Sequence, residues 1–265
     1  MSITKTEAIV LKSIKFGDTS KIATLYTKNY GKIKVIAKGI RKPKSRLAGA
    51  LQTFSHIQIV FYKKRSSEIY LLSQSETLKS YQSLYKDLNR YVFASAALEL
   101  LDRLITGEES NPQLFELILS TLSFMENCPE GSLEKSFCSY ALKLAHLLGY
   151  KPKFDKCVSC NKHVEGESVL FSPEKGGIIC KRCARADHAY LRLSNASVTS
   201  ALKLQSIKTE DLNTYNIPKE HLEEISSVIL NLLDYHTGGG KDLKSLEFLK
   251  ADQSFRSPGS KFGQT

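Results

Sequence analysis

The first eighty residues carry the alternation of apolar and polar positions that is typical of β-strands. Five runs with this pattern are separated by turn signals, and they cover residues 8–16, 21–27, 32–38, 56–62 and 68–76. In the third run, apolar Ile33, Val35 and Ala37 alternate with lysines, which predicts one apolar and one largely basic strand face. The segment 45–52 is long enough for one or two helical turns. Three strands, a short helix and two strands is the order expected of an OB-fold barrel.

After about residue 80 the apolar residues recur at helical spacing. Such runs cover 81–105, 111–127 and 132–150, and further helices are predicted at about 193–206 and 218–236. Asn111 with Pro112, and Ser132 before the next run, are start signals, and Gly149 is a stop signal. The pattern therefore predicts a bundle of helices behind the barrel.

Four of the six cysteines form two Cys-x-x-Cys pairs. The pairs are separated by nineteen residues, and they are Cys157 with Cys160 and Cys180 with Cys183. Each pair can place two sulfurs on one edge of a tetrahedron, so this spacing predicts a structural zinc site that stabilises a segment too small for its own core. A thioredoxin-like redox pair is the alternative, but it requires one such motif at the start of a helix after a strand. His163 and His188 are nearby spare ligands, and Cys128 and Cys138 are interpreted as ordinary thiols.

The expected fold class is α+β and multidomain: an N-terminal five-stranded OB-fold β-barrel, then an α-helical bundle carrying a four-cysteine zinc module. A chain of 265 residues with 42% hydrophobic residues is long enough for this. The expected divisions are 1–79 for the nucleic-acid-binding barrel, 80–150 and 191–250 for the helical domain, 151–190 for the zinc module and 251–265 for a disordered tail. No apolar run approaches the roughly 20 residues that span a bilayer, and the N-terminus carries no signal-peptide pattern, so a cytoplasmic location is expected.

The positive charge is concentrated in the predicted barrel. The whole chain has a net charge of +11, yet residues 1–80 hold sixteen Lys and Arg against four Asp and Glu, and the later residues hold 22 against 23. Two basic connections, 41–46 and 63–65, and the lysine face of the third strand would form a groove suited to nucleic-acid phosphates. Phe16, Tyr30 and Tyr62 lie nearest the turns and are the candidates for stacking on unpaired bases.

No motif in the sequence indicates an enzymatic reaction. The glycine-rich stretch 237–241 lacks the spacing of a phosphate-binding loop and follows a helix, so it is interpreted as a helix stop and a flexible link. No nucleophile elbow or zinc-protease motif is present.

Three stretches carry a resemblance to a known family. They are "AIVLKSIKFGDTSKIATLYTKNYGKIKVIAKGIRKPKSRLAGALQTF", "IQIVFYKKRSSEIYLLSQSE" and the closing "LKSLEFL", and together with the four cysteines they resemble the bacterial recombination mediator family RecO. The resemblance implies an OB-fold, a helical bundle interrupted by a zinc module, and a non-catalytic role in DNA repair. Proteins of that family bind single- and double-stranded DNA, anneal complementary strands and, with RecR, help to load RecA onto DNA coated by single-strand-binding protein (SSB).

The resemblance and the charge pattern together assign residues to DNA contact. They are Lys34, Lys38, Arg41, Lys42, Lys44, Arg46, Lys63, Lys64 and Arg65. In the family, the acidic SSB tail with its apolar end would bind a hydrophobic pocket with basic rims in the helical domain.

Two alternatives from other classes stay open at this point. An RNA-binding or ribosome-associated protein would also combine an OB barrel with a four-cysteine ribbon. An enzyme that uses the zinc for hydrolysis would need an open coordination position on the metal.

Overall fold

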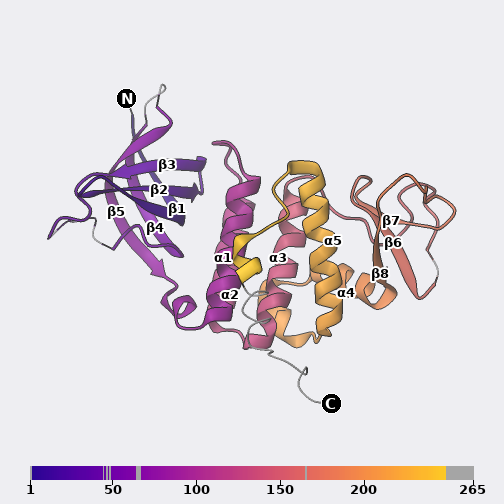
Figure 1. Ribbon diagram of the computed structural model, residues 1–265. Helices are drawn as coiled ribbons and strands as arrows, with labels where there is room; N and C mark the ends of the chain where they lie inside the picture. The colour runs from indigo at the N-terminus through magenta and orange to yellow at the C-terminus, as the bar shows by residue number, and fades with distance from the viewer. Residues whose placement is uncertain are drawn as a thin grey trace, which may run out of the picture.

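A five-stranded barrel, a bundle of helices and a small three-stranded sheet follow one another across the molecule (Figure 1). The computed structural model describes residues 2–43, 45, 47, 49–63, 67–164 and 166–248. The predicted tail at 251–265 lies outside the described residues. Among the helices that are described, none combines the length and the apolar character that crossing a bilayer requires.

The barrel has the strand order of an OB-fold, as the sequence predicts. Its strands are β1 (Ser2–Phe16), β2 (Ser20–Thr27), β3 (Gly31–Ala37), β4 (Ser55–Lys63) and β5 (Ile69–Ser80). They close in the order β1-β2-β3-β5-β4, with β3 and β5 parallel and the other pairs antiparallel. Closure depends on the length of β1, which pairs with β4 along its first half and with β2 along its second. The barrel therefore has no open sheet edge.

A β-bulge in β1 changes which side chains face outward. The register with β2 shifts between Val10 and Lys12, so one extra residue is inserted there. Without this insertion, simple alternation from Val10 would direct Lys12, Ile14 and Phe16 into the barrel. With it, Ile14 and Phe16 are 62% and 51% exposed. The bulge thus places two large apolar side chains on the surface at the end of the β1–β2 hairpin.

The helices form at the predicted places, and Asn111 caps the second of them as predicted. They are α1 (Leu88–Leu104), α2 (Pro112–Asn127), α3 (Leu133–Leu147), α4 (Asn195–Ser206) and α5 (Lys219–Thr237), with short 3-10 turns at Gln82–Tyr85, Glu130–Ser132 and Thr209–Thr214. The side chains of Asp87, Asn111 and Ser194 accept backbone N–H bonds at the starts of α1, α2 and α4.

Three local expectations need correction. The described residues of the segment 45–52 form turns instead of a helix, with the Ala50 N–H donating to the Leu47 carbonyl. Ser132 makes no side-chain cap, because a 3-10 turn runs directly into α3. The helix stop is confirmed, because Gly238 ends α5 in the left-handed conformation. The flexible link predicted after it is wrong at Gly240, which packs so closely on α5 that an added Cβ would lie 2.2 Å from the Leu230 carbonyl oxygen.

The cysteine-containing segment builds its own antiparallel sheet, which the sequence did not predict. Its strands are β6 (Ser168–Ser172), β7 (Gly177–Ile179) and β8 (Leu191–Ser194), in the order β7-β6-β8. Gly177 is required at its position, because a Cβ there would lie 2.4 Å from a methyl group of Val158 and 2.7 Å from the Lys153 carbonyl oxygen. Phe171 and Leu193 join the buried core of the helices, so this sheet is fixed to the bundle.

The barrel and the bundle share apolar contacts and a set of ion pairs. Leu11, Tyr26 and Phe54 of the barrel are buried in the core cluster of the helices. Five lysines of the barrel region pair with acids beyond residue 100: Lys12 and Lys32 with Asp102, Lys28 with Glu116, Lys63 with Glu108, and Lys79 with Glu126. Burial alone would raise the pKa of Glu108, but hydrogen bonds from Lys63 and Tyr70 lower it overall. Part of the positive charge that the sequence places on the barrel is therefore neutralised at this junction.

Candidate nucleic-acid interface and metal centre

The structure brings the four predicted cysteine ligands together. The sulfur atoms of Cys157, Cys160, Cys180 and Cys183 all lie within 4.8 Å of one another. Those of Cys160 and Cys180 are 3.8 Å apart, which is close to the sulfur–sulfur distance of about 3.8 Å that tetrahedral zinc with Zn–S bonds of about 2.3 Å requires. The donor set and its spacing therefore fit a four-coordinate metal ion, and the described residues contain no other such cluster.

Local backbone geometry explains why the sulfurs converge. In the first pair, the Cys157 N–H donates to the Lys162 carbonyl, and the left-handed Asn161 donates back to the Cys157 carbonyl. In the second pair, the N–H groups of Cys183 and Ala184 both donate to the Cys180 carbonyl. Each pair is thus held in a tight turn before any metal is considered.

The electrostatics of the cluster favour a bound cation. Cys157 is 1% exposed, and burial acts to raise its pKa, but N–H groups of Cys180, Cys160 and Ser159 outweigh burial and lower the pKa to about 6. Hydrogen bonds with the thiols of Cys180 and Cys160 raise the pKa of Cys183 to about 12. A thiolate crowded by other sulfurs is stabilised when a metal cation takes the place of the protons.

The other candidate ligands stand apart from this cluster. His188 pairs with Glu174 and Asp187, and neither it nor His163 belongs to the group of clustered ligand atoms. Cys128 and Cys138 are buried in the bundle, where burial raises the pKa of both thiols. Their interpretation as ordinary buried thiols agrees with this placement.

Four of the predicted DNA-contact residues lie along one side of the barrel. Lys34 is exposed in the middle of β3, Lys38 follows the end of that strand, and Arg41 and Lys42 are exposed in the turn beyond it. The Arg41 N–H donates to the Thr19 carbonyl, which places this turn against the β1–β2 hairpin. Among the described residues, none of the four has an ion-pair partner.

Of the other five predicted contacts, the structure describes only Lys63, which lies elsewhere. Lys63 points to the junction, where it pairs with Glu108 at 2.7 Å and lies over the rings of Tyr30 and Tyr70. It is therefore part of the link between barrel and bundle. The remaining four, Lys44, Arg46, Lys64 and Arg65, lie outside the described residues.

Only one of the three stacking candidates is well exposed. Tyr30 and Tyr62 are half-buried, and Tyr30 packs edge-on against Phe61. Phe16, by contrast, is 51% exposed. Phe16 stands at the end of β1 beside the turn that carries Arg41. A base that stacks on Phe16 would thus lie next to cations suited to its phosphates.

Sequence reasoning missed an apolar row on the outside of the barrel. Ile14, Ile22, Ile36 and Leu71 stand directly opposite one another across β1, β2, β3 and β5. The lysine face of β3 is therefore interrupted by Ile36. Lys12 was the residue in the sequence that could have revealed this row. Without a bulge in β1, alternation would place Lys12 inside the barrel, and a charged side chain at an inward position indicates that the register of the strand has shifted.

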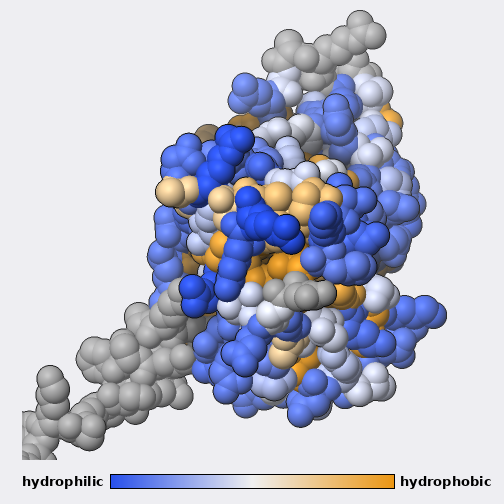
Figure 2. Space-filling model, turned by 90° about the vertical axis from the view of Figure 1, so that its right-hand side faces the viewer, coloured by the Kyte–Doolittle hydropathy of each residue, from blue (hydrophilic) through white to orange (hydrophobic). Residues whose placement is uncertain are grey.

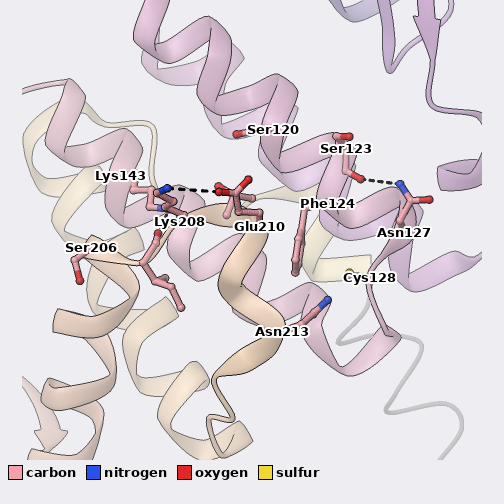
Figure 3. Close-up of a pocket in the computed structure, with 12 residues that line it drawn as sticks. Ser120, Ser123, Phe124, Asn127, Cys128, Lys143, Ser206, Lys208, Glu210 and Asn213 are labelled. Carbon is pink, nitrogen blue, oxygen red and sulfur yellow. Dashed lines mark hydrogen bonds and ion pairs between the residues drawn. The ribbon is translucent and has the colours of Figure 1, made fainter.

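A hollow of about 760 Å³ lies in the bundle between α2, α3 and the segment after α4 (Figure 3). Most of its lining residues are polar, while Phe124, Cys128 and Ile207 contribute apolar surface. Of its two lysines, Lys143 donates to the Ile207 carbonyl at 2.7 Å, and Lys208 lies 3.7 Å from the Glu210 carboxylate. Burial lowers the pKa of Lys143.

Comparison with known proteins decides the family. The model of the N-terminal part of recombination protein O matches residues 1–81, and that of its C-terminal part matches residues 85–247. The chain belongs to the RecO family of DNA repair proteins. It is 33% identical to the DNA repair protein RecO of Halalkalibacterium halodurans over 92% of this chain and 93% of the relative. A further match, 33% identical, is the RecO of Caldanaerobacter subterraneus, over 94% and 98%.

A RecO protein of Desulfitobacterium hafniense is 36% identical over 69% of this chain, and that match covers 65% of the relative's length. Membership of the RecO family confirms the resemblance seen in the sequence. It places the chain among DNA repair proteins, which favours DNA over the RNA-binding and ribosome-associated alternative.

Proposed function

We propose that this RecO-family chain is a non-catalytic mediator of DNA repair and homologous recombination. It binds single- and double-stranded DNA through the barrel and anneals complementary strands. The observation that carries the proposal is the group of four cations without ion-pair partners among the described residues, Lys34, Lys38, Arg41 and Lys42, on the barrel.

The chemistry of this face favours contact with the backbone over sequence recognition. Lysine and arginine side chains on strands and turns reach phosphates, which are the same in every sequence. Phe16 and the apolar row, in which Ile14 is exposed and the other three residues are half-buried, offer contacts to bases that are equally independent of sequence. A strand whose phosphates are neutralised while its bases stay accessible can pair with a complement, which is the physical basis of annealing.

The metal in this proposal is zinc, and its role is structural. Cys157, Cys160, Cys180 and Cys183 would hold it, and four protein ligands leave no position for a reacting water. Bound zinc would supply folding free energy to the segment 151–190 and nothing to a reaction. Reduced cysteines of this kind suit a cytoplasmic protein. Association with the nucleoid would follow from the proposed DNA binding.

The proposed partners are those of the family. With RecR, the protein would help RecA to assemble on DNA that SSB covers, and the SSB tail would bind the chain directly. We also propose that the domain boundaries lie after residues 79, 150, 190 and 250, as the sequence predicts.

Annealing of SSB-coated complementary oligonucleotides tests this function directly. The purified, zinc-loaded protein is expected to accelerate strand pairing, measured by loss of a fluorescence signal between labelled strands. RNA oligonucleotides of the same sequence serve as the comparison. No acceleration with DNA, or acceleration with RNA alone, would contradict the proposed function.

Phe16 is expected to contribute to single-stranded DNA binding by stacking. Phe16→Ala should weaken that binding by about 1 to 3 kcal/mol and leave duplex binding almost unchanged, because paired bases offer no open face to the ring. Fluorescence anisotropy with a single strand and with its duplex measures the difference. Ile3→Ala is the matched control, since Ile3 is an exposed apolar residue on the other half of β1. Equal losses for both DNA forms would argue against stacking.

A further inference from the structure

A second hollow lies beside the cysteine cluster, over the sheet β7-β6-β8. It has a volume of about 730 Å³, and we call it the module hollow. Its aliphatic floor consists of Val164 and Leu170, which are half-buried, with Val169 and Ile179 beneath them, and Cys160, Cys180 and Cys183 also belong to the lining. Figure 2 shows this end of the molecule, where an apolar surface is flanked by strongly hydrophilic side chains.

Cations form the rim of the module hollow. They are Lys162, Lys181, Arg182 and Arg192, all exposed, and among the described residues no Asp or Glu lines the hollow. In the described part of the chain, none of the four has an ion-pair partner. They come from three separate stretches of sequence. Lys162 follows the first cysteine pair, and Lys181 and Arg182 lie within the second. Arg192 lies in β8, opposite Leu170 of β6.

This charge is a local feature of the module. Residues 151–192 hold nine Lys and Arg against five Asp and Glu, while the remaining residues after 80 hold thirteen against eighteen. The basic character that the barrel shows at one end of the molecule thus returns at the other end.

The metal site offsets only part of that charge. Four thiolates around a divalent ion would carry a net charge of −2, and Lys162, Lys181 and Arg182, each within two residues of a cysteine, would help to balance it. The four rim cations carry a charge of +4, so two positive charges would remain after the −2 of the metal cluster is balanced. Arg192 is remote from the cysteine turns in sequence, so balancing the thiolates does not account for it.

We propose that the module hollow binds a segment of single-stranded DNA, as a second strand site separate from the barrel. Phosphates would contact the rim, where the two arginines can bind them in bidentate fashion. An unstacked base would pack on the aliphatic floor. A duplex could use the rim but not the floor, because its bases are stacked inside, so the site prefers single strands. The choice of DNA as the occupant rests on the proposed function.

A second strand site has a consequence for annealing. The barrel and the sheet β7-β6-β8 lie at opposite ends of the molecule with the bundle between them (Figure 1). A protein with two such sites keeps two strands within the dimensions of a single molecule, which raises the concentration of each strand near the other.

The test compares oligo(dT) binding by the zinc-loaded protein and its Lys162→Glu/Arg192→Glu variant. Ultraviolet cross-linking with mass spectrometry is expected to map contacts to residues 160–192 as well as to the barrel. In the variant the module cross-links should fall at least tenfold, and the slope of log affinity against log salt should fall by about 0.7 for each phosphate that the variant no longer neutralises. Lys151→Glu/Lys153→Glu is the matched control, because it reverses the same number of charges at two exposed lysines of the same module that lie outside the hollow. Zinc content equal to that of the unchanged protein shows that the module has folded.

Cross-links at the barrel with none at the module, or module cross-links that persist in the variant, would overturn this inference and leave the proposed function intact. Module cross-links with none at the barrel would support the inference while removing the proposed barrel interface.

The rival occupant is an acidic peptide, for which a fluorescent peptide of alternating Asp and Leu is the probe. If Arg192→Glu abolishes binding of that peptide but leaves the oligo(dT) cross-links unchanged, the module hollow is a peptide site and the proposal fails.

Discussion

Reversing the charge of Lys38, Arg41 and Lys42 together is expected to weaken DNA binding at least tenfold at low ionic strength. The three side chains are exposed on the turn that follows β3, and none has an ion-pair partner among the described residues. If each contacts one phosphate of a single strand, the slope of log affinity against log salt should fall by about 2, at roughly 0.7 per contact. Anisotropy titrations at four or more salt concentrations measure both quantities.

The control for this experiment changes the same amount of charge at a distance from the barrel. Lys203, Lys208 and Lys219 are exposed on α4, after α4 and on α5, and their combined reversal should leave the salt slope almost unchanged. If both triple variants lose the same affinity, net charge alone governs binding and the barrel is not the interface. Lys12 and Lys32 are unsuitable controls, because their pairing with Asp102 joins the barrel to α1.

Removal of the metal is expected to unfold the cysteine module and to weaken the bundle that carries it. Structural zinc supplies roughly 10 kcal/mol or more of folding free energy in small modules. In the segment around the four cysteines, the regular structure of the described residues is a three-stranded sheet. Because Phe171 and Leu193 belong to the buried core of the helices, loss of the module should also expose part of that core. Chelation should therefore release one zinc ion per chain, lower the temperature of thermal unfolding and open the segment 155–190 to proteases.

Substitution of a ligand separates this effect from damage by the chelator. Cys180→Ser should abolish zinc binding and reproduce the protease sensitivity, since one sulfur is removed from the cluster. Cys128→Ala is the matched control, because Cys128 is buried in the bundle away from the cluster and should retain one zinc per chain. A protein without metal that resists proteolysis as well as the loaded form would contradict a structural role for zinc.

Periodicity predicted the secondary structure well because it reports which face of each element is buried. The five strands and five helices lie where alternation and helical spacing place them, and the caps at Asn111 and Gly238 are local features that act within one turn. The bulge at Lys12 is harder to predict from periodicity, since it depends on how β1 meets both β2 and β4. The sheet β7-β6-β8 consists of strands of three to five residues, too short for a clear pattern.

The sequence by itself determined the OB-fold order, the helices and the cysteine quartet, because each is recorded in spacing along the chain, and its resemblance to the RecO family indicated the family that the comparisons show. Tertiary structure decided which basic side chains remain available to a partner. Lys32 and Lys63 look equivalent to Lys34 and Lys38 in the sequence, yet they pair with acids 70 and 45 positions away. It also turned Ile14 and Phe16 outward and gathered four cations around an apolar floor beside the cysteines. The physical reason is that availability of a charge depends on its neighbours in space, which come from distant parts of the chain.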